Sequence, residues 1–285
     1  MGRRKLAIAI PASIISDTPH MREKTSKIGL IGRAAAIFRV DEIIIYQDKL
    51  GRGRQNSEAD LVTLLLSYLE TPQYLRKRLF KLEHSLKFAG VLPPLRTPNH
   101  PLNKKAENLK VGEYREGVII SETRDGMLVD IGVERPALLR ERNWALRKRL
   151  SLQIIKTGEL IEAQIVERDE IPYYWGYTVD AENCSLGDLI KQRKFDLVLA
   201  TSKIGAKYKN VIEQIAEKWI TAHHVLIAFG APSRGLHEIV ADEGLNLIEI
   251  VDFVVNTIPE QGTATVRTEE ALVASLAILN VQLGW

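Results

Sequence analysis

Five short apolar segments constrain the fold of this chain more than any other feature. They lie at Leu6–Ile10, Ile43–Tyr46, Asp196–Ala200, Val225–Phe229 and Phe253–Val255. Continuous apolar runs such as the first two are typical of parallel strands that helices cover on both faces. Apolar residues at helical spacing follow the first run, from Ile28 to Val40. The sequence therefore predicts a three-layer α/β domain built on a parallel sheet.

The middle of the chain has a different pattern. Short alternating or β-branched stretches lie at Glu113–Ile120, Met127–Ile131 and Glu159–Val166, and glycines separate them. Strands at such spacing predict a small β-barrel of the oligonucleotide/oligosaccharide-binding (OB) type. The stretch from Gly126 to Gly132 resembles the S1-like members of that class, which bind RNA.

The domain boundaries follow from composition. Four prolines between residues 92 and 103 are typical of a linker, and the α/β pattern returns after about residue 180. We therefore predict that residues 1–93 and 181–285 form one discontinuous α/β domain. Residues 94–180 are predicted to form a barrel inserted into it.

Composition restricts the kind of protein this is. The chain has 285 residues, 45% hydrophobic and 26% charged, as in ordinary soluble globular proteins. Its one cysteine, Cys184, cannot form an internal disulfide, which favours a reducing, cytoplasmic compartment. No apolar run is long enough to span a membrane. Because Pro11 ends the apolar run near the N-terminus after five residues, we interpret that run as a strand and not as a signal peptide.

The overall net charge of +3 conceals an uneven distribution. Residues 1–110 carry 20 basic and 10 acidic side chains, a net charge of +10, whereas residues 111–182 and 183–285 carry −4 and −3. The strongest local cluster lies on a helix that begins at Thr71-Pro72 and includes Arg76, Lys77 and Lys81. We predict that these three side chains bind RNA, although a solvated basic surface without a partner would look the same.

Three loops rich in small or polar residues follow three of the predicted strands. They are Thr201–Gly205, Gly230–Gly235 and Asn256–Thr263. The carboxyl ends of parallel strands meet at one edge of a sheet, where open α/β folds bind ligands. No Gly-x-Gly-x-x-Gly follows the first strand, so a dinucleotide remains only a fold-level analogy. No cysteine or histidine spacing predicts a metal site.

Several motifs in order resemble one known family. They include Asp252–Pro259, Gln261-Gly262-Thr263 and Val266–Ala271, preceded by Phe229–Pro232 and Tyr174–Tyr177. These stretches are similar to the archaeal and eukaryotic RNA methyltransferases of the SPOUT class, whose fold is an α/β trefoil knot. The resemblance covers most of the chain, the barrel insertion included. It implies S-adenosylmethionine as cofactor, RNA as methyl acceptor, and a homodimer whose active site lies at the interface.

The resemblance also implies which residues form the sites. The cofactor loops would contribute Thr201, Gly205, Gly230, Pro232, Gly235, Asn256, Ile258, Gly262, Thr263 and Thr265. Arg267 would contact RNA or the cofactor, or else form an ordinary salt bridge at the surface or in the dimer. The next four residues, Thr268–Ala271, favour a threonine N-cap with two acids at a helix N-terminus, so we assign no catalytic role to Glu269 or Glu270.

A second similarity concerns Arg33. The stretch from Ile28 to Val40 is similar to the first motif of the SpoU branch, in which the arginine belongs to the catalytic centre. This chain has Lys27 where that branch has asparagine, which favours methylation of a base over methylation of the ribose. We therefore predict an S-adenosylmethionine-dependent methyltransferase that modifies a base of ribosomal RNA, with Arg33 as a catalytic residue. The alternative is a non-catalytic RNA-binding or ribosome-assembly factor that retains the fold.

Overall fold

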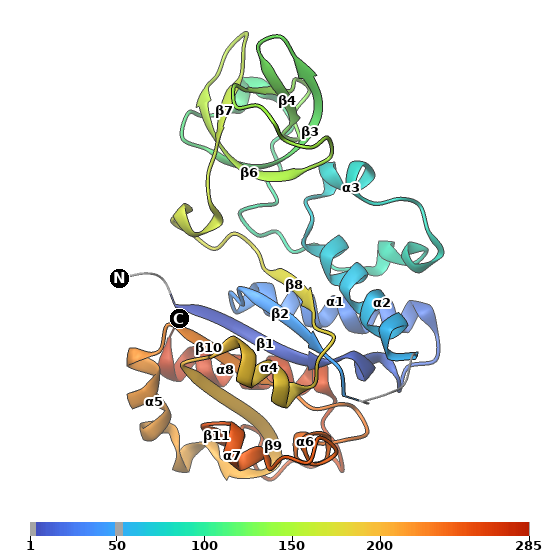
Figure 1. Cartoon of the computed structure of the whole chain (residues 1–285), viewed down its shortest axis with the longest axis vertical. Helices are drawn as coiled ribbons and strands as arrows, with labels where there is room; N and C mark the ends of the chain where they lie inside the picture. The colour runs from blue at the N-terminus through green and yellow to red at the C-terminus, as the bar shows by residue number, and fades with distance from the viewer. Residues whose placement is uncertain (1–3, 49–53, 285) are drawn as a thin grey trace. The chain divides into compact units, whose positions relative to one another are not determined.

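The computed structural model describes residues 4–48 and 54–284, which form two compact units (Figure 1). The first, here called the sheet unit, contains the chain up to Ser67, Ser85–Pro93 and everything from Tyr177 on. The second, the barrel unit, contains Tyr68–His84 and Pro94–Gly176. The two units are therefore interleaved along the sequence.

The sheet unit is built on six strands that are all parallel. They are β1 (Lys5–Pro11), β2 (Glu42–Tyr46), β8 (Thr178–Ala181), β9 (Leu197–Lys207), β10 (His224–Ala228) and β11 (Phe253–Asn256). Their order across the sheet is β11-β9-β10-β1-β2-β8. In the centre, Ile8 pairs with Ile43 on one side and with Ile227 on the other. All three side chains are fully buried, as continuous apolar runs require.

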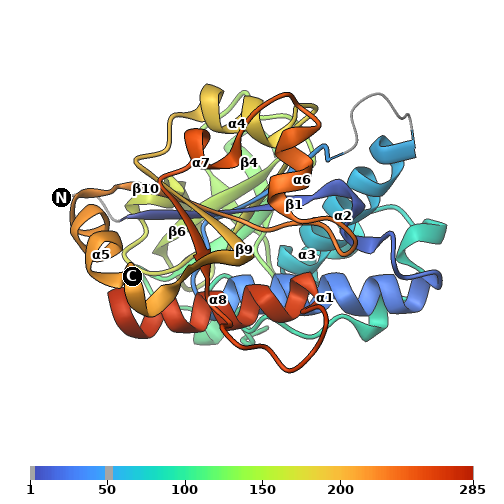
Figure 2. The same cartoon turned by 90° about the horizontal axis from the view of Figure 1, so that it is seen from below.

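Helices cover both faces of this sheet. One face packs on α4 (Leu186–Arg193), α6 (Leu236–Ala241) and α7 (Leu247–Ile250), through a core that includes Ala9, Ile44 and Leu226. Alternate strand residues point the other way. Figure 2 shows α1 (Met21–Ile37) and α8 (Thr268–Leu283) together on that opposite face. The remaining helices are α2 (Arg54–Glu70), whose last turn belongs to the barrel unit, and α5 (Ile212–Thr221).

The sequence expectation for the segment after Ala200 needs correction. The composition of residues 201–205 predicts a loop, but β9 continues in extended conformation to Lys207. Its pairing with β11 nevertheless skips these five residues, because Val254 pairs with Ala200 and Val255 pairs with Ala206. The segment is thus a bulge in the pairing between β9 and the edge strand β11.

The barrel unit contains a closed five-stranded barrel. Its strands are β3 (Tyr114–Thr123), β4 (Gly126–Asp130), β5 (Ala137–Leu139), β6 (Arg149–Lys156) and β7 (Glu162–Ile165). The strand order is β3-β4-β5-β7-β6, in which β5 and β7 are parallel and every other pair is antiparallel. Alternate residues such as Met127, Val129 and Ile131 fill its interior.

The structure places the unit boundaries differently from composition alone. Residues 68–84, which include the basic helix α3 (Gln73–Leu79), group with the barrel and not with the sheet. At the other end, β8 pairs with β2, so the barrel unit ends at Gly176. Proline content marks where a chain changes direction, but packing decides to which unit a short helix belongs.

Across the described ranges, no helix is both long and apolar enough to cross a membrane.

Candidate functional site

A cavity of about 380 Å³ lies at the carboxyl edge of the sheet unit. Its walls come from three segments that follow β9, β10 and β11: residues 201–204, 229–238 and a set between Val255 and Ala271. A second, more open cavity of about 330 Å³ adjoins it, and both are lined by Lys203, Ile204 and Asn256. The first volume falls within the range of small-molecule sites. The three predicted loops therefore do converge.

Side-chain hydrogen bonds to backbone hold these walls together. Thr201 Oγ1 donates to the carbonyl oxygen of Ala228 at 3.0 Å, and Asn256 Nδ2 donates to that of Lys203 at 2.8 Å. Thr268 Oγ1 donates to the carbonyl oxygen of Gly230 at 3.0 Å. Each bond joins two of the three segments or the strands before them. The side-chain amide of Asn256 thus helps to hold the cavity wall together.

The predicted cofactor residues divide into three groups. Seven line the larger cavity: Thr201, Gly230, Pro232, Gly235, Asn256, Ile258 and Thr265. Thr263 lines the second cavity. Gly205 and Gly262 line neither. A Cβ on Gly205 would lie 2.7 Å from the carbonyl oxygen of Val254, so this glycine permits the close approach of β9 and β11.

Gly235 shows how the cavity wall could accommodate a ligand. Its backbone has φ −75° and ψ 164°, a conformation open to any residue, and a Cβ built there meets no atom within 4 Å. Since Gly235 lines the larger cavity, the absent side chain leaves room beside it. By contrast, a Cβ on Gly230 would lie 3.0 Å from the carbonyl oxygen of Arg234, within the tight turn that precedes α6.

Sequence reasoning missed several polar side chains on the cavity wall. Ser202, His237, Glu238 and Gln261 all line it. His237 and Glu238 lie in the first turn of α6, directly after a predicted loop. The composition of this loop indicated only residues up to Gly235. Because α6 begins at the cavity, its first turn also lies on the cavity wall.

The first turn of α8 also differs from the sequence prediction. The N-cap residue is Arg267, and the carboxylate of Glu270 accepts a hydrogen bond from its backbone N–H at 2.9 Å. The predicted cap, Thr268, instead donates its hydroxyl to Gly230, as described above. The threonine therefore fastens α8 to the cavity wall. The Arg267 side chain is exposed, which is compatible with either role predicted for it.

Lys27 occupies a buried position between α1 and α8. Its side chain is only 6% exposed, and Nζ lies 2.8 Å from Asp17 Oδ1 and 3.4 Å from Glu269 Oε2. The charge of Lys27 is thus neutralised by one carboxylate before α1 and another in the first turn of α8. Removing the lysine would leave the buried carboxylate of Glu269 without this counter-charge.

Arg33, the predicted catalytic residue, lies on α1 and does not line either cavity of its own chain. It is half-buried. Leu30 and Ile37, three residues before and four residues after it, are 54% and 57% exposed. Positions at this spacing share one face of a helix, so Arg33 lies on a face that carries two exposed apolar side chains.

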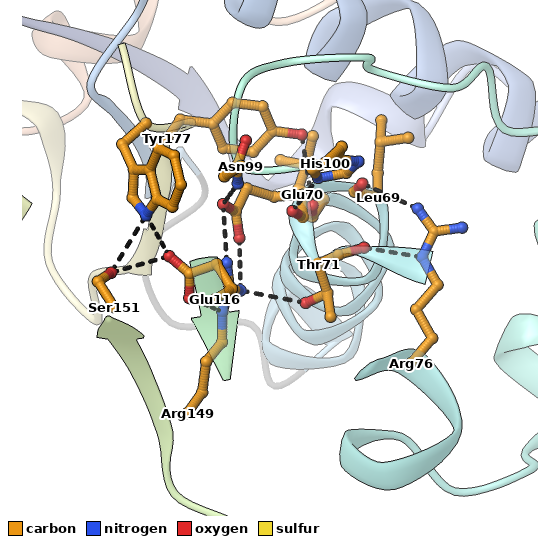
Figure 3. Close-up of polar contacts among 12 residues, drawn as sticks. Leu69, Glu70, Thr71, Arg76, Asn99, His100, Glu116, Arg149, Ser151 and Tyr177 are labelled. Carbon is orange, nitrogen blue, oxygen red and sulfur yellow. Dashed lines mark hydrogen bonds and ion pairs between the residues drawn. The ribbon is translucent and has the colours of Figure 1, made fainter. Parts of the chain in front are cut away.

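The three predicted RNA-binding residues differ in their surroundings, and Lys81 lies after the end of α3 at Leu79, not on the helix as the sequence predicted. Arg76 donates from Nε to the carbonyl oxygen of Thr71 and from Nη2 to that of Leu69 (Figure 3). Its guanidinium lies 4.6 Å from the centre of the Tyr68 ring. Lys77 and Lys81 are exposed. Arg76 therefore satisfies carbonyls at the end of α2, whereas the two lysines face solvent.

A polar network joins Glu70, in the last turn of α2, and Asn99 of the linker to the outside of the barrel. Arg149 lies 2.7 Å from carboxylate oxygens of both Glu70 and Glu116, and these two acids are 5% and 3% exposed (Figure 3). Ser151 Oγ donates to Glu116 at 2.8 Å, and Asn99 Nδ2 donates to Glu70 at 2.8 Å. These residues all belong to the barrel unit, so the network fixes the segment preceding α3 to the barrel.

No group of three or more histidine, cysteine, aspartate or glutamate side chains within residues 4–48 and 54–284 is arranged to hold a metal ion.

Proteins similar to this chain include RNA methyltransferases. A family model described as "Putative RNA methyltransferase" matches residues 5–279. The human protein named 28S rRNA (uridine-N(3))-methyltransferase is 32% identical, over 96% of this chain and 77% of its own length. The mouse protein of that name is 31% identical, over 96% and 75%. An uncharacterised protein of Halobacterium salinarum is 31% identical, over 96% and 98%.

Proposed function

This chain belongs to that RNA methyltransferase family, and on this premise we propose that it transfers a methyl group from S-adenosylmethionine to a base of ribosomal RNA. The membership confirms the resemblance predicted from sequence. The observation that carries the proposal is the cavity at the carboxyl edge of the sheet unit, where seven of the ten predicted cofactor residues meet.

The residues of the cavity fit S-adenosylmethionine. When bound, the cofactor supplies an electrophilic methyl carbon on sulfur, so the protein has to position two reactants and need not form a covalent bond. Ile204, Val255 and Ile258 provide apolar wall, and Glu238 provides a carboxylate that can face a cationic ligand. Gly235 leaves open the space that a side chain would fill.

We propose the N3 nitrogen of a uridine as the methyl acceptor, because the human and mouse relatives are named for that reaction. Methylation would replace the N3–H bond by an N3–carbon bond: the proton would pass to water, and the bond between the methyl carbon and sulfur would break to leave S-adenosylhomocysteine. Negative charge would develop on the neighbouring carbonyl oxygens as the proton is lost. A guanidinium keeps its charge at any working pH and offers a fixed fork of donors. Arg33 is therefore assigned to orient the base and to stabilise that charge.

The same proposal includes a knotted homodimer. Helix α8 follows β11 at the edge of the sheet, yet it packs against α1, which follows β1, so the C-terminal segment passes β9 and β10. Such a passage supports a knot. Exposed apolar side chains on both helices, Leu30, Ile37, Val273 and Val281, support a second copy of the chain as their cover.

Filling the cavity tests the cofactor site. Replacing Gly235 by valine puts two methyl groups into the cavity wall at a backbone conformation that valine adopts freely. We expect the affinity for S-adenosylmethionine, measured by calorimetry, to fall about 10- to 100-fold. The matched control is Gly90→Val, at an exposed glycine where a Cβ also meets nothing within 4 Å. Equal affinity in the two variants would place the cofactor elsewhere.

The reaction itself is tested with labelled S-adenosylmethionine and ribosomal RNA from a strain that lacks this gene. We expect the label to appear as 3-methyluridine after digestion. Cofactor binding without transfer to any RNA would support the alternative of a non-catalytic RNA-binding or ribosome-assembly factor. Label in a ribose would contradict the proposed acceptor.

A further inference from the structure

The loop between β5 and β6, residues 140–148, concentrates positive charge within an acidic part of the chain. Residues 111–182 have a net charge of −4, yet five of their ten basic residues fall between Arg140 and Arg149, with one acid among them. Four of the five, Arg140, Arg142, Arg147 and Lys148, are exposed. We call residues 140–148 the cationic loop.

The charge of this loop is only partly neutralised. Arg140 lies 2.8 Å from Glu162. Outside the loop, Arg149 is held in the buried network by Glu70 and Glu116. Within the described residues, no carboxylate lies at ion-pair distance from Arg142, Arg147 or Lys148. Exposed cationic side chains without nearby counter-charges make the local electrostatic potential more positive and attract a polyanion.

The backbone that carries these cations is fixed. Trp144 packs against the core of the barrel. The N–H of Arg147 donates to the carbonyl oxygen of Ile119 at 2.9 Å, and the N–H of Ile119 donates to that of Lys148 at 3.1 Å. The guanidinium of Arg142 donates to the carbonyl oxygen of Arg124, in the turn between β3 and β4. Little ordering entropy would be lost when a ligand binds such a surface.

We propose that the cationic loop, together with the exposed Arg124, binds the phosphate backbone of a single-stranded segment of the RNA substrate. This inference rests on the proposed function and adds to it a second RNA contact besides α3. Three arginines and a lysine supply donors suited to phosphate oxygens. Leu146, which is 62% exposed in the same loop, offers an apolar surface next to them for a ribose or a base.

The test compares two triple variants with the same change of charge. One is Arg142→Gln/Arg147→Gln/Lys148→Gln. The control, Lys104→Gln/Lys105→Gln/Lys110→Gln, removes three exposed lysines from elsewhere in the barrel unit. The probe is a labelled oligouridylate of about 16 nucleotides, the upper site size of an OB fold. Affinity is measured over a range of salt concentrations, and circular dichroism verifies folding.

We expect the log–log salt slope of the loop variant to be smaller by about 2 units, roughly 0.7 for each single-strand phosphate that the loop neutralises. That decrease corresponds to roughly 100-fold weaker binding at 0.1 M salt, and the control should retain the wild-type slope. A loop variant with the slope of the control overturns the inference, as does weaker binding with an unchanged slope, which would indicate contacts to bases.

Failure of the proposed function would look different. It would appear in the wild-type protein, as a lack of S-adenosylmethionine binding or of methyl transfer to ribosomal RNA. If the wild type methylates RNA and the loop variant does so with an unchanged KM for that RNA, only the inference about the cationic loop is overturned.

Discussion

His100 illustrates how burial of one side chain makes stability depend on pH. Its Nε2 lies 2.6 Å from the carbonyl oxygen of Glu70, which can only accept, so the neutral ring must carry its proton on Nε2 (Figure 3). Burial lowers the pKa of His100 to about 4, although this hydrogen bond opposes the shift. An unfolded chain would protonate the same ring near pH 6.5.

Stability of the barrel unit should therefore fall as the pH falls from about 6.5 towards 4, because the unfolded state binds a proton that the folded state excludes. Between pH 7 and pH 5 we expect His100→Gln to lose about 2 kcal/mol less unfolding free energy than the wild type. Urea denaturation at both pH values measures this difference. His84→Gln, at an exposed histidine of the same unit, should behave like the wild type. Parallel losses in all three proteins would contradict the assignment.

At the scale of one element, α3 separates side chains that hold the fold from side chains that can meet RNA. Arg76 donates to two carbonyls and lies over Tyr68, and Arg78 pairs with Asp130 of the barrel. Lys77 and Lys81 are the exposed cations that remain. Tertiary contacts thus divide these basic side chains into two groups: the arginines hold the fold, and the lysines can meet RNA.

Charge reversal should separate these groups. Lys77→Glu/Lys81→Glu is expected to weaken binding of the oligouridylate and to lower its log–log salt slope by about 0.7 for each phosphate that is no longer neutralised. Arg76→Ala should instead lower the melting temperature, because two carbonyls are deprived of a charged donor, with little change in slope. The slope is read from fluorescence anisotropy and the melting temperature from calorimetry. A large decrease of slope in Arg76→Ala alone would reverse the two roles.

At the scale of the whole molecule, the proposed role of Arg33 requires this side chain to lie beside a cofactor cavity. Arg33 lines neither of the two cavities described above, and it lies between Leu30 and Ile37 on an apolar face of α1. A second copy that covers this face could bring its own cavity close to Arg33. In the proposed homodimer, each site would then take Arg33 from one chain and cofactor loops from the other.

Mixed dimers test this arrangement. Arg33→Ala should lower turnover about 100-fold, the effect of removing one preorganised donor, with S-adenosylmethionine affinity little changed. It is combined with Gly235→Val subunits at equal amounts and assayed at an S-adenosylmethionine concentration that fills the wild-type site but lies well below the Kd of the Gly235→Val variant. The mixture should then recover about a quarter of wild-type activity, since half of the dimers are mixed and each has one intact site. Native mass spectrometry verifies that mixed dimers form. If verified mixed dimers are as inactive as both parents, the site is not shared.

The sequence by itself determined the main elements of the sheet unit. Five of its six strands were apparent because strands buried on both faces need continuous apolar runs, and that requirement is local. The sixth, β8, has the sequence Thr178-Val179-Asp180-Ala181 and lies at the sheet edge beside β2, where burial is incomplete. The local sequence of β8 does not indicate a strand, and only its pairing with β2 makes it one.

The roles of individual side chains depend on the tertiary structure. Arg76 and Lys77 are adjacent cations, and only the approach of the α2 carbonyls distinguishes them. Thr268 follows the rule for an N-cap, but its hydroxyl reaches Gly230 because the turn after β10 lies beside it. The cationic loop was hidden by averaging charge over 72 residues of sequence. In each case, the outcome depends on which distant groups approach a side chain, and local sequence does not contain that information.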